Sequence, residues 1–566
     1  MNTKQLFVDA LAPVLAEHLS ADEILNLIEV PKDTSHGDLA FPVFQLARVF
    51  RKAPAQIAAD LVTELDQTNF EAMVAVGPYI NVSLKRESVG AALVQEVMAA
   101  GSVYGDVNIG EGRNMTIDFS SPNIAKPMSM GHLRSTVIGN AIANIAAKVN
   151  YQPVRINHLG DWGTQFGKLI VAYKMWGDDD LIAADPVKEL VKLYVDFHEV
   201  AEDKPELEEE ARAAFKRLED GDEEMIRLWT WFKDESLAEF DKVYKMLNIG
   251  FDSFNGEAFY NDKMQPIIDE LEAKGITTVN EGATIVDLED LNLPPALIKK
   301  SDGATLYVTR DLAAANYRKE TYDFAKNVYV VGNEQSTHFK QLKAVLTKLG
   351  REWADDIVHV PFGLITLDGK KLSTRKGKIV LLEEVLNEAV DLALEQITAK
   401  NPDLANKEEV AHQVGVGAVI FHDLKTERMN SFDFNLAEIV QFEGETGPYV
   451  QYTYARSKSL IRKYGKEITD DFTDVAFDLT DDYSWEIVKK LIDYPRIIVQ
   501  AIERFEPSQV AKYAVSLAQL FNKYYGNTRI LEDNAQLDAR LALVKAMTIV
   551  LKDALNLLGI EAPEEM

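Results

Sequence analysis

Residues 121–136, SPNIAKPMSMGHLRST, combine residue types that could bind the phosphates of a nucleotide. A helical pattern begins at Gly131 and His132, and the N-terminus of a helix attracts phosphate through its unpaired amides and partial positive charge. Gly131 would let a flat purine lie against the backbone, and His132 could donate a hydrogen bond to a phosphate oxygen. Taken alone, the stretch is better explained as a capped helix with a packed histidine.

A second candidate stretch is strongly basic. Residues 370–378, KKLSTRKGK, hold five basic residues and no acidic one. A flexible loop of this kind could bring ammonium groups to a triphosphate, and the alternative is a solvated basic hairpin. It is not a Walker-type phosphate loop, because the span from Gly363 to Gly369 is one residue too long and Lys371 replaces the required Ser or Thr.

The pattern over residues 115–160 predicts the elements that position the first stretch. MTIDF is typical of a buried strand, residues 131–150 have apolar side chains at helical spacing, and PVRINHLG predicts a second strand. Together they predict a βαβ unit. The stretch 121–136 then lies in the loop at the carboxyl end of the first strand, where open α/β sheets bind ligands.

The rest of the chain predicts a multidomain α/β protein, since 566 residues correspond to roughly three to four domains. The first hundred residues, with an amphipathic start and the strand-like YINVSL, predict a small α/β module. Residues 165–275 are predicted to be mostly helical. Strand-like pieces return at ATIVDL, ATLYVTR, NVYVVG and IVHVPFGLITL, and after about residue 385 helical patterns predict an all-α C-terminal module.

Composition excludes several classes of protein. The chain has no cysteine, which excludes disulfides and thiol catalysis, and its nine histidines form no H-E-x-x-H, so we expect no protein-bound zinc. The net charge of −30 argues against a general nucleic-acid coat, and we expect no DNA partner. Residues 178–224, with 18 acidic and 6 basic residues, are expected to form a solvated helical insertion.

The chain also has no pattern of a membrane or secreted protein. No apolar run approaches the roughly 20 residues that a membrane span needs. The first twenty residues place Asp9 and Glu17 among their apolar residues, unlike a secretory signal. We therefore expect a cytoplasmic protein that does not bind a membrane.

Taken in this order, SMGH at 129–132 and KLSTR at 371–375 resemble the HIGH and KMSKS signatures of class I aminoacyl-tRNA synthetases. Six stretches along essentially the whole chain are similar to the arginyl-tRNA synthetase family: SSPNIAKPMSMGHLRST, NHLGDWGTQFG, LYVTRDLAAA, VVGNEQSTHFKQL, GPYVQYTYAR and the ending LLGIEAPEEM. One such match could be chance, but six in the family's order indicate membership.

The resemblance implies the architecture. A class I Rossmann-type catalytic domain with a parallel sheet would occupy residues 109–385, with a helical insertion at about 170–250. An N-terminal additional domain at 1–108 would contact the tRNA elbow. A helical stem-contact region would follow at 386–445, and an all-helical anticodon-binding domain at 446–566. We expect the enzyme to be a monomer.

The resemblance also implies the reaction. ATP with Mg²⁺ activates L-arginine to arginyl adenylate and diphosphate, and the arginyl group then passes to the terminal adenosine of tRNA(Arg) for translation. Neither step needs a protein nucleophile, so catalysis depends on positioning and on electrostatic stabilisation of the phosphates. This agrees with a chain that has no obvious catalytic triad.

The family's arginine pocket corresponds to five positions of this chain. A guanidinium with five donors and a charged α-amine require carboxylate and amide oxygens. Tyr307 and Asp311, four residues apart, are expected on one helix face or turn, although an isolated pair of this kind would more often lie on the surface. Asp118 has a shorter reach than the glutamate found in some relatives. The implied arginine-binding residues are Asp118, Asn123, Tyr307, Asp311 and Gln335.

ATP would bind between the two signatures, which depart from the family pattern at two positions. Ser129 replaces the first histidine of HIGH, and Thr374 replaces the second lysine of KMSKS. In family members without that lysine, a lysine just upstream of HIGH takes over its charge, and Lys126 occupies this place; the alternative is a solvated loop lysine. The implied ATP-binding residues are Ser129, Gly131, His132, Lys371, Leu372 and Ser373, and the catalytic ones are His132, Lys126, Lys371 and Ser373.

Two further groups of residues are implied to contact tRNA. Tyr449, Tyr452 and Arg456 fall on one helical face, which could stack unpaired bases and neutralise phosphate, and the resemblance adds Met566 to this anticodon site. The alternative for such an aromatic stripe is core packing. In the N-terminal module, Tyr79 and Asn81 are implied to contact the tRNA elbow, and an aromatic plug in a small sheet is the alternative.

Two other functions compete with an active ligase. The departures at Ser129 and Thr374 would suit a non-catalytic tRNA-binding or regulatory paralogue, but such a protein has no reason to retain the complete arginine pocket together with His132. Another HIGH-type nucleotidyltransferase is disfavoured by the absent zinc ligands and by the helical C-terminus.

Overall fold

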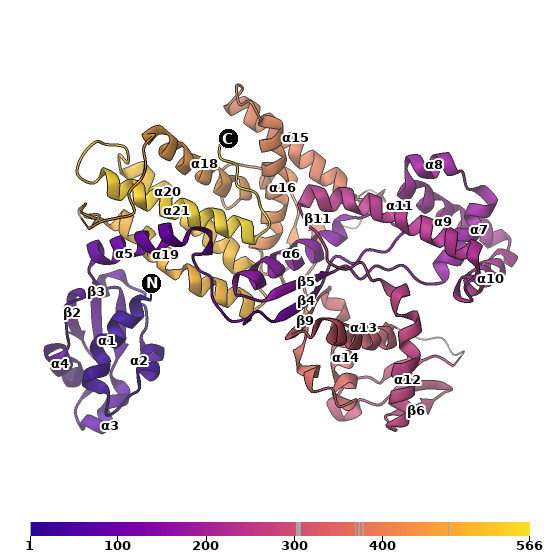
Figure 1. The fold of residues 1–566 in the computed structure, drawn as a ribbon, viewed down its shortest axis with the longest axis horizontal. Coiled ribbons are helices and arrows are strands. Elements are labelled where there is room, and N and C mark those ends of the chain that lie inside the picture. The colour runs from indigo at the N-terminus through magenta and orange to yellow at the C-terminus, as the bar shows by residue number, and fades with distance from the viewer. Residues whose placement is uncertain (1, 302–306, 368–369, 372–373, 376–377, 474) are drawn as a thin grey trace. The chain divides into compact units, whose positions relative to one another are not determined.

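The computed structural model describes residues 2–301, 307–367, 370–371, 374–375, 378–473 and 475–566 (Figure 1). The chain divides into two compact units. The first comprises Met1–Gly105, Thr453–Arg496 and Ser516–Asp553, and the second comprises Asp106–Tyr452, Ile497–Val515 and Ala554–Met566. Neither unit is one continuous segment, because the long helices near the C-terminus are shared between them.

The first unit contains the predicted N-terminal α/β module. Its antiparallel sheet has the order β1-β3-β2, with the predicted strand YINVSL at its centre. Phe7 packs edge-on against Phe41 and Phe70 in the core of the module. The elements are β1 (Leu39–Pro42), β2 (Phe70–Val76), β3 (Tyr79–Leu84), α1 (Thr3–Leu15), α2 (Ala21–Leu27), α3 (Ala47–Phe50), α4 (Pro54–Glu64) and α5 (Arg86–Ala100).

Distant segments of the sequence meet within this first unit. The Trp485 indole donates a hydrogen bond to Asp38 at 2.9 Å, and Arg86 pairs with Asp482 at 2.8 Å. Gly90 faces the Phe477 ring so closely that a Cβ atom would lie 2.4 Å from it. The predicted C-terminal helices are α18 (Gly447–Tyr464), α19 (Asp482–Glu503), α20 (Ser508–Asn527) and α21 (Leu537–Leu557).

The second unit is built on a four-stranded parallel sheet, as the predicted βαβ unit requires. The strand order is β10-β9-β4-β5. Helix α6 (Leu133–Lys148) connects β4 to β5 and is buried along nearly its whole length. Gly139 allows its close approach to β4, since a Cβ atom there would lie 2.2 Å from the Phe119 ring. The strands are β4 (Asn114–Asp118), β5 (Gln152–Ile156), β9 (Lys326–Val330) and β10 (Ile357–Val360).

The segment between β5 and β9 contains the predicted helical insertion and a small antiparallel sheet of order β6-β7-β8. The predicted strand ATIVDL is β7. The insertion comprises α7 (Thr164–Trp176), α8 (Asp179–Ala184), α9 (Pro186–Asp203), α10 (Glu206–Glu219) and α11 (Glu223–Leu247). After it come α12 (Met264–Ala273), β6 (Thr277–Asn280), β7 (Ala283–Val286), β8 (Ala296–Lys299), α13 (Tyr307–Tyr322) and α14 (Ser336–Lys348).

One strand prediction is wrong. The residues YVTR of ATLYVTR form the first turn of α13, not a strand. The β-branched Val308 and Thr309 suggested a strand, but the Thr309 hydroxyl donates to the Ile298 carbonyl and Leu312 is fully buried. Tertiary packing thus overrides a local β preference.

Short strands and two long helices follow β10. Strand β11 pairs antiparallel with β12 and parallel with β15. Among the described residues, no helix is long and apolar enough to cross a lipid bilayer. The elements are β11 (Ile365–Leu367), β12 (Lys370–Lys371), β13 (Thr374–Arg375), β14 (Lys378–Ile379), α15 (Leu382–Lys400), α16 (Lys407–Lys425), β15 (Phe432–Asp433) and α17 (Leu436–Ile439).

Candidate active site at the carboxyl ends of the parallel strands

Ser129 caps the helical segment that carries Gly131 and His132. Its hydroxyl accepts a hydrogen bond from the Gly131 amide at 3.3 Å, and its own amide donates to Nδ1 of His132 at 3.1 Å. Burial lowers the pKa of His132 below its ordinary value, so the ring is neutral at pH 7. Because Nδ1 accepts a hydrogen bond, the proton lies on Nε2, which is then a donor. The arrangement gives a neutral imidazole donor beside an exposed Gly131.

The loop between β4 and this cap carries Asn123 and Lys126, both of which are exposed. Asn123 forms a parallel bridge with Gly160, and the Ile124 amide donates to the Gly160 carbonyl at 3.1 Å. Gly160 lets Asn123 keep its present side-chain position, since a Cβ atom there would lie 1.8 Å from Oδ1 of Asn123. The stretch NHLGDWG thus fixes the position of Asn123.

Asp118 lies at the end of β4 and is 5% exposed. Its Oδ2 pairs with the buried Arg318 at 2.7 Å, and its Oδ1 accepts a hydrogen bond from the Ser121 hydroxyl at 2.9 Å. The Arg318 guanidinium in turn lies over the Tyr329 ring. An internal guanidinium therefore holds the short Asp118 side chain in place.

Asp311 lies one helical turn after Tyr307 on α13. Its carboxylate is 2.5 Å from Nε2 of His338 on α14. Burial raises the pKa of Asp311, but the hydrogen bond and charge of His338 outweigh it, so the pKa lies below its ordinary value. Tyr307 is 69% exposed, and Gln335 is exposed at the end of the short helix η7 (Asn333–Gln335) that follows β9.

Glu257 is an acidic residue that interacts electrostatically with Asp311, and no motif in the sequence pointed to it. Burial raises its pKa to about 7, although the neighbouring Arg310 opposes the shift. Its amide donates to the Leu159 carbonyl, and the next amide, of Ala258, donates to the buried Asp161. Glu257 lies far along the chain from the other pocket residues, so no spacing pattern could reveal it.

Two basic residues that hold the acidic ones were also missed. His338 lies within VVGNEQSTHFKQL, so the signal was present in a stretch already singled out. Arg318 lies seven residues after Asp311, which places both on one face of α13. Among the described residues, no group of three His, Asp or Glu side chains is placed to hold a metal ion.

The basic stretch is described only in part. Lys371 ends β12, where its backbone pairs with Thr366 of β11. The side chain of Lys371 and the residues Leu372 and Ser373 lie outside the described part of the chain. Ser129 forms a bridge with Leu381, and the Met130 amide donates to the Val380 carbonyl at 2.9 Å. Val380 and Leu381, which follow the basic stretch, therefore contact the residues that cap the helical segment.

Three of the predicted anticodon residues lie in the second unit. Tyr452 packs against Phe442 with ring centroids 6.1 Å apart, and Nζ of Lys400 lies 4.3 Å above the Phe442 ring. Met566 packs against the same apolar cluster, and Tyr449 is half-buried on α18. The structure thus brings Met566 and Tyr452 to one cluster.

The remaining predicted tRNA-contacting residues belong to the first unit. Arg456 donates to Asn522 at 2.7 Å and lies over the Tyr525 ring. Tyr79 is half-buried against Phe44, whose ring is 53% exposed. Asn81 is only 4% exposed, so its amide does not lie on the open surface. Phe44 is the exposed aromatic residue of this module that the sequence did not reveal.

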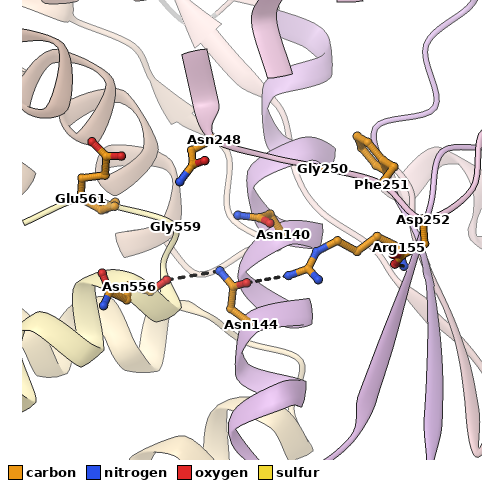
Figure 2. A pocket seen from close by; sticks show the side chains of 11 residues that line it. Asn140, Asn144, Arg155, Asn248, Gly250, Phe251, Asp252, Asn556, Gly559 and Glu561 are labelled. Atoms are coloured by element: carbon orange, nitrogen blue, oxygen red, sulfur yellow. Dashed lines mark hydrogen bonds between the residues drawn. The ribbon is translucent and has the colours of Figure 1, made fainter. Parts of the chain in front are cut away.

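A polar cavity of ≈ 530 Å³ lies against α6, and none of the predicted site residues lines it. Figure 2 shows Asn144 between Arg155 and Asn556: its Oδ1 accepts from Arg155 at 2.7 Å, and its amide donates to the Asn556 carbonyl at 3.3 Å. The lining includes both acidic and basic side chains, Asp252, Glu561 and Arg155. This cavity is separate from the candidate site.

Three family models match consecutive parts of the chain. Residues 93–436 match the family model of the class I (R) tRNA synthetase catalytic domain. Residues 1–84 match the arginyl tRNA synthetase N terminal domain, and residues 450–566 match the DALR anticodon binding domain.

Similar proteins span the full length of the chain. The arginine–tRNA ligases of Enterococcus faecalis and Lactiplantibacillus plantarum are 63% and 58% identical, each over all of both chains. The structure of Thermus thermophilus arginyl-tRNA synthetase has a TM-score of 0.80 at 26% identity, covering all of both chains. The chain belongs to the arginyl-tRNA synthetase family of class I aminoacyl-tRNA synthetases.

Proposed function

We propose that this protein ligates L-arginine to tRNA(Arg) in two steps with ATP as the energy source. The observation that carries the proposal is the gathering of acidic residues Asp118, Asp311 and Glu257 in the unit whose capped helix presents His132. A guanidinium and an α-amine need such acceptors, and a helix N-terminus suits the phosphates of ATP.

In the first step an oxygen of the arginine carboxylate attacks the α-phosphorus of ATP. The bond from that phosphorus to the bridging oxygen breaks, and diphosphate leaves with Mg²⁺, which enters as part of the ATP substrate complex. In the second step the 2′-hydroxyl of the terminal adenosine of tRNA attacks the arginyl carbonyl, AMP leaves, and the hydroxyl proton is released. The chain's own contribution is to orient these groups and to stabilise phosphate charge.

We assign the arginine pocket to Asp118, Asn123, Tyr307, Asp311 and Gln335, with Glu257 added. Asp311 is held ionised by His338, which suits it to receive the guanidinium. Asp118 already pairs with Arg318, so we assign it to the α-amine of arginine and not to the guanidinium. Asn123, in the loop that follows β4, would bind the same end of the substrate. Tyr307 would cover the substrate from its exposed position.

We assign ATP to Gly131, His132 and the stretch with Lys371, Leu372 and Ser373. Nε2–H of His132 would donate to a phosphate oxygen, and Ser129 would act as the cap that orients this ring. Lys126 would supply the cation that Thr374 cannot. Together these groups give the positive field that the α-phosphate and the leaving diphosphate require.

Transfer RNA would be bound along the rest of the molecule. We assign anticodon recognition to Tyr449, Tyr452, Met566 and Arg456, with Lys400 as an added cation above the aromatic rings. The elbow contact is assigned to Tyr79 with Phe44.

The domain division proposed from the sequence is kept, at 1–108, 109–385, 386–445 and 446–566. We infer that the protein acts in the cytoplasm, where translation uses arginyl-tRNA, and that it is a monomer.

An aminoacylation assay tests the proposal. Purified protein, ATP, Mg²⁺ and unfractionated tRNA are incubated with radiolabelled arginine or, in parallel, radiolabelled lysine. We expect acid-precipitable arginyl-tRNA and no lysyl-tRNA. The single ammonium group of lysine cannot make the several hydrogen bonds that carboxylate and amide oxygens make with a planar guanidinium. Lysine charging, or no charging at all, would refute the proposal.

A further inference from the structure

The loop that carries Asn123 and Lys126 adopts a backbone conformation that it would not keep unaided. Ser120, Ser121 and Ala125 have φ values of 70°, 49° and 58°, in the left-handed region. Residues with a side chain are strained there and persist only when their surroundings hold them. The contacts that hold the loop are therefore part of the site.

Helix α11 of the insertion supplies two of these contacts and a third to the neighbouring Asp161. The Tyr244 hydroxyl bonds the Ser120 hydroxyl at 2.8 Å, and Nζ of Lys233 pairs with Asp161 at 2.6 Å. Oγ of Ser236 accepts the Ala125 amide at 2.9 Å. Lys233, Ser236 and Tyr244 recur at spacings close to whole helical turns, so they share one face of α11. This face of α11, which lies beyond the acidic segment 178–224 that was expected to be solvated, packs on the loops of the candidate site.

The two ends of the loop are held by different partners. Asn123 and Ile124 are fixed by Gly160. On the far side, the Leu382 amide donates to the Met128 carbonyl. Among the described residues, one hydrogen bond holds the backbone between Ile124 and Met128, and it runs from the Ala125 amide to Ser236. Ser236 is fully buried, and its own hydroxyl proton goes to the Phe232 carbonyl at 2.7 Å, which leaves its lone pair aimed at Ala125.

We propose that Ser236 is a positioning residue for the adenylation step. Its oxygen keeps Ala125 in the left-handed conformation and so fixes where the following residue, Lys126, presents its ammonium group. Asn123 does not depend on Ser236, because Gly160 holds it. The inference rests on the proposed function, in which Lys126 stabilises the phosphates, and it adds a residue of the insertion to that function.

The first test is Ser236→Ala, assayed by arginine-dependent ATP–diphosphate exchange in the presence of tRNA. Without the acceptor, Ala125 leaves the left-handed region, and we expect kcat to fall roughly 5- to 30-fold. The KM for arginine should stay within about twofold of the parent value, because Asn123 keeps its own anchor. A merely structural loss would change both constants.

A rescue experiment separates positioning from general damage. Glycine adopts the left-handed region without steric cost, so Ala125→Gly should restore most of the kcat lost in Ser236→Ala, to within roughly threefold of the parent. In a Lys126→Ala background, Ser236→Ala should add almost no further loss, because the group that it positions is already gone.

Ser457→Ala is the matched control. Ser457 is also a fully buried helix serine, with its hydroxyl donating to the Tyr454 carbonyl and accepting from Thr548. It should leave kcat unchanged while costing similar stability. Should Ser236→Ala not fold, Ser236→Cys retains the volume and a weak acceptor and should give a smaller fall in kcat.

The outcomes are distinguishable. If Ser236→Ala exchanges like the parent, or loses kcat and arginine affinity together without rescue by Ala125→Gly, the positioning role is refuted. If the parent itself shows no arginine-dependent exchange, the proposed function fails instead.

Discussion

Ser129 replaces a histidine that the family's signature usually carries, and the structure gives it a local task. It caps the helical segment and, through its backbone amide, fixes the protonated nitrogen of His132. A serine can do both but cannot carry charge. The departure therefore removes an imidazole from the proposed ATP site while keeping the cap, and this motivates the prediction that Lys126 supplies positive charge there.

Lys126→Ala should lower kcat for arginine-dependent ATP–diphosphate exchange roughly 10- to 100-fold, because a cation near the developing phosphate charge is removed. The KM for arginine should change little, since Lys126 is not among the residues assigned to the arginine pocket. Lys188→Ala is the control, as its side chain is 76% exposed on the insertion helix α9. Parent-like exchange by Lys126→Ala would show that Thr374 needs no substitute cation.

Glu257 predicts a pH dependence of arginine binding. Burial raises its pKa to about 7, so the carboxyl is neutral at pH 6 and ionised at pH 8. Only the ionised form attracts a guanidinium strongly, so the KM for arginine should fall by roughly three- to tenfold from pH 6 to pH 8. Steady-state kinetics at several pH values measure this slope.

Glu257→Gln should abolish the pH dependence of the KM for arginine and leave the KM high at every pH. Glu320 is an exposed residue of α13, and Glu320→Gln should retain the parent's pH dependence. A slope that persists in Glu257→Gln would assign the titration to another group.

The local hydrophobic pattern predicted the parallel strands correctly, but it failed where long-range contacts determine the secondary structure. The apolar runs of β4, β9 and β10 and the helical period of α6 are visible in the sequence because each element buries a continuous face. The first turn of α13 was predicted as a strand because the packing of Leu312 and the contact of Thr309 with β8 are not local. The role of α11 was invisible for the same reason.

The buried pair Arg134–Asp423 connects α6 to α16 and gives a prediction on stability. Both side chains are at most 2% exposed, and burial raises the pKa of Asp423 to about 6 despite Arg134. The raised pKa means that burial disfavours the Asp423 carboxylate by more than Arg134 favours it, so Asp423→Asn, which removes the charge, should stabilise the protein at pH 8 by roughly 3 kcal/mol and raise its melting temperature.

The sign of the pH effect follows from the raised pKa. At pH 5 the carboxyl is mostly neutral in the folded parent, so burial disfavours it less, and the gain in melting temperature of Asp423→Asn over the parent should shrink. Asp391→Asn on the exposed face of α15 serves as the control. An equal difference at pH 5 and pH 8 would contradict the assignment of the pKa to this pair.

At the scale of the whole molecule, the order of the motifs identified the family, but the sequence could not show which segments meet. The N-terminal module shares a compact unit with helical segments from the far end of the chain through pairs such as Asp38–Trp485. Glu257, Arg318 and Lys400 are far in sequence from the residues that they interact with, so only the folded structure brings them to notice. Asn123 and Asp311 were predicted from family motifs to bind arginine, and that role stays a prediction.

The activation of arginine for transfer to tRNA can be measured by ATP–diphosphate exchange with each of the twenty amino acids, with and without tRNA. We expect exchange with arginine when tRNA is present, and background exchange with every other amino acid. Exchange driven by a different amino acid, or no exchange with arginine under either condition, would contradict it.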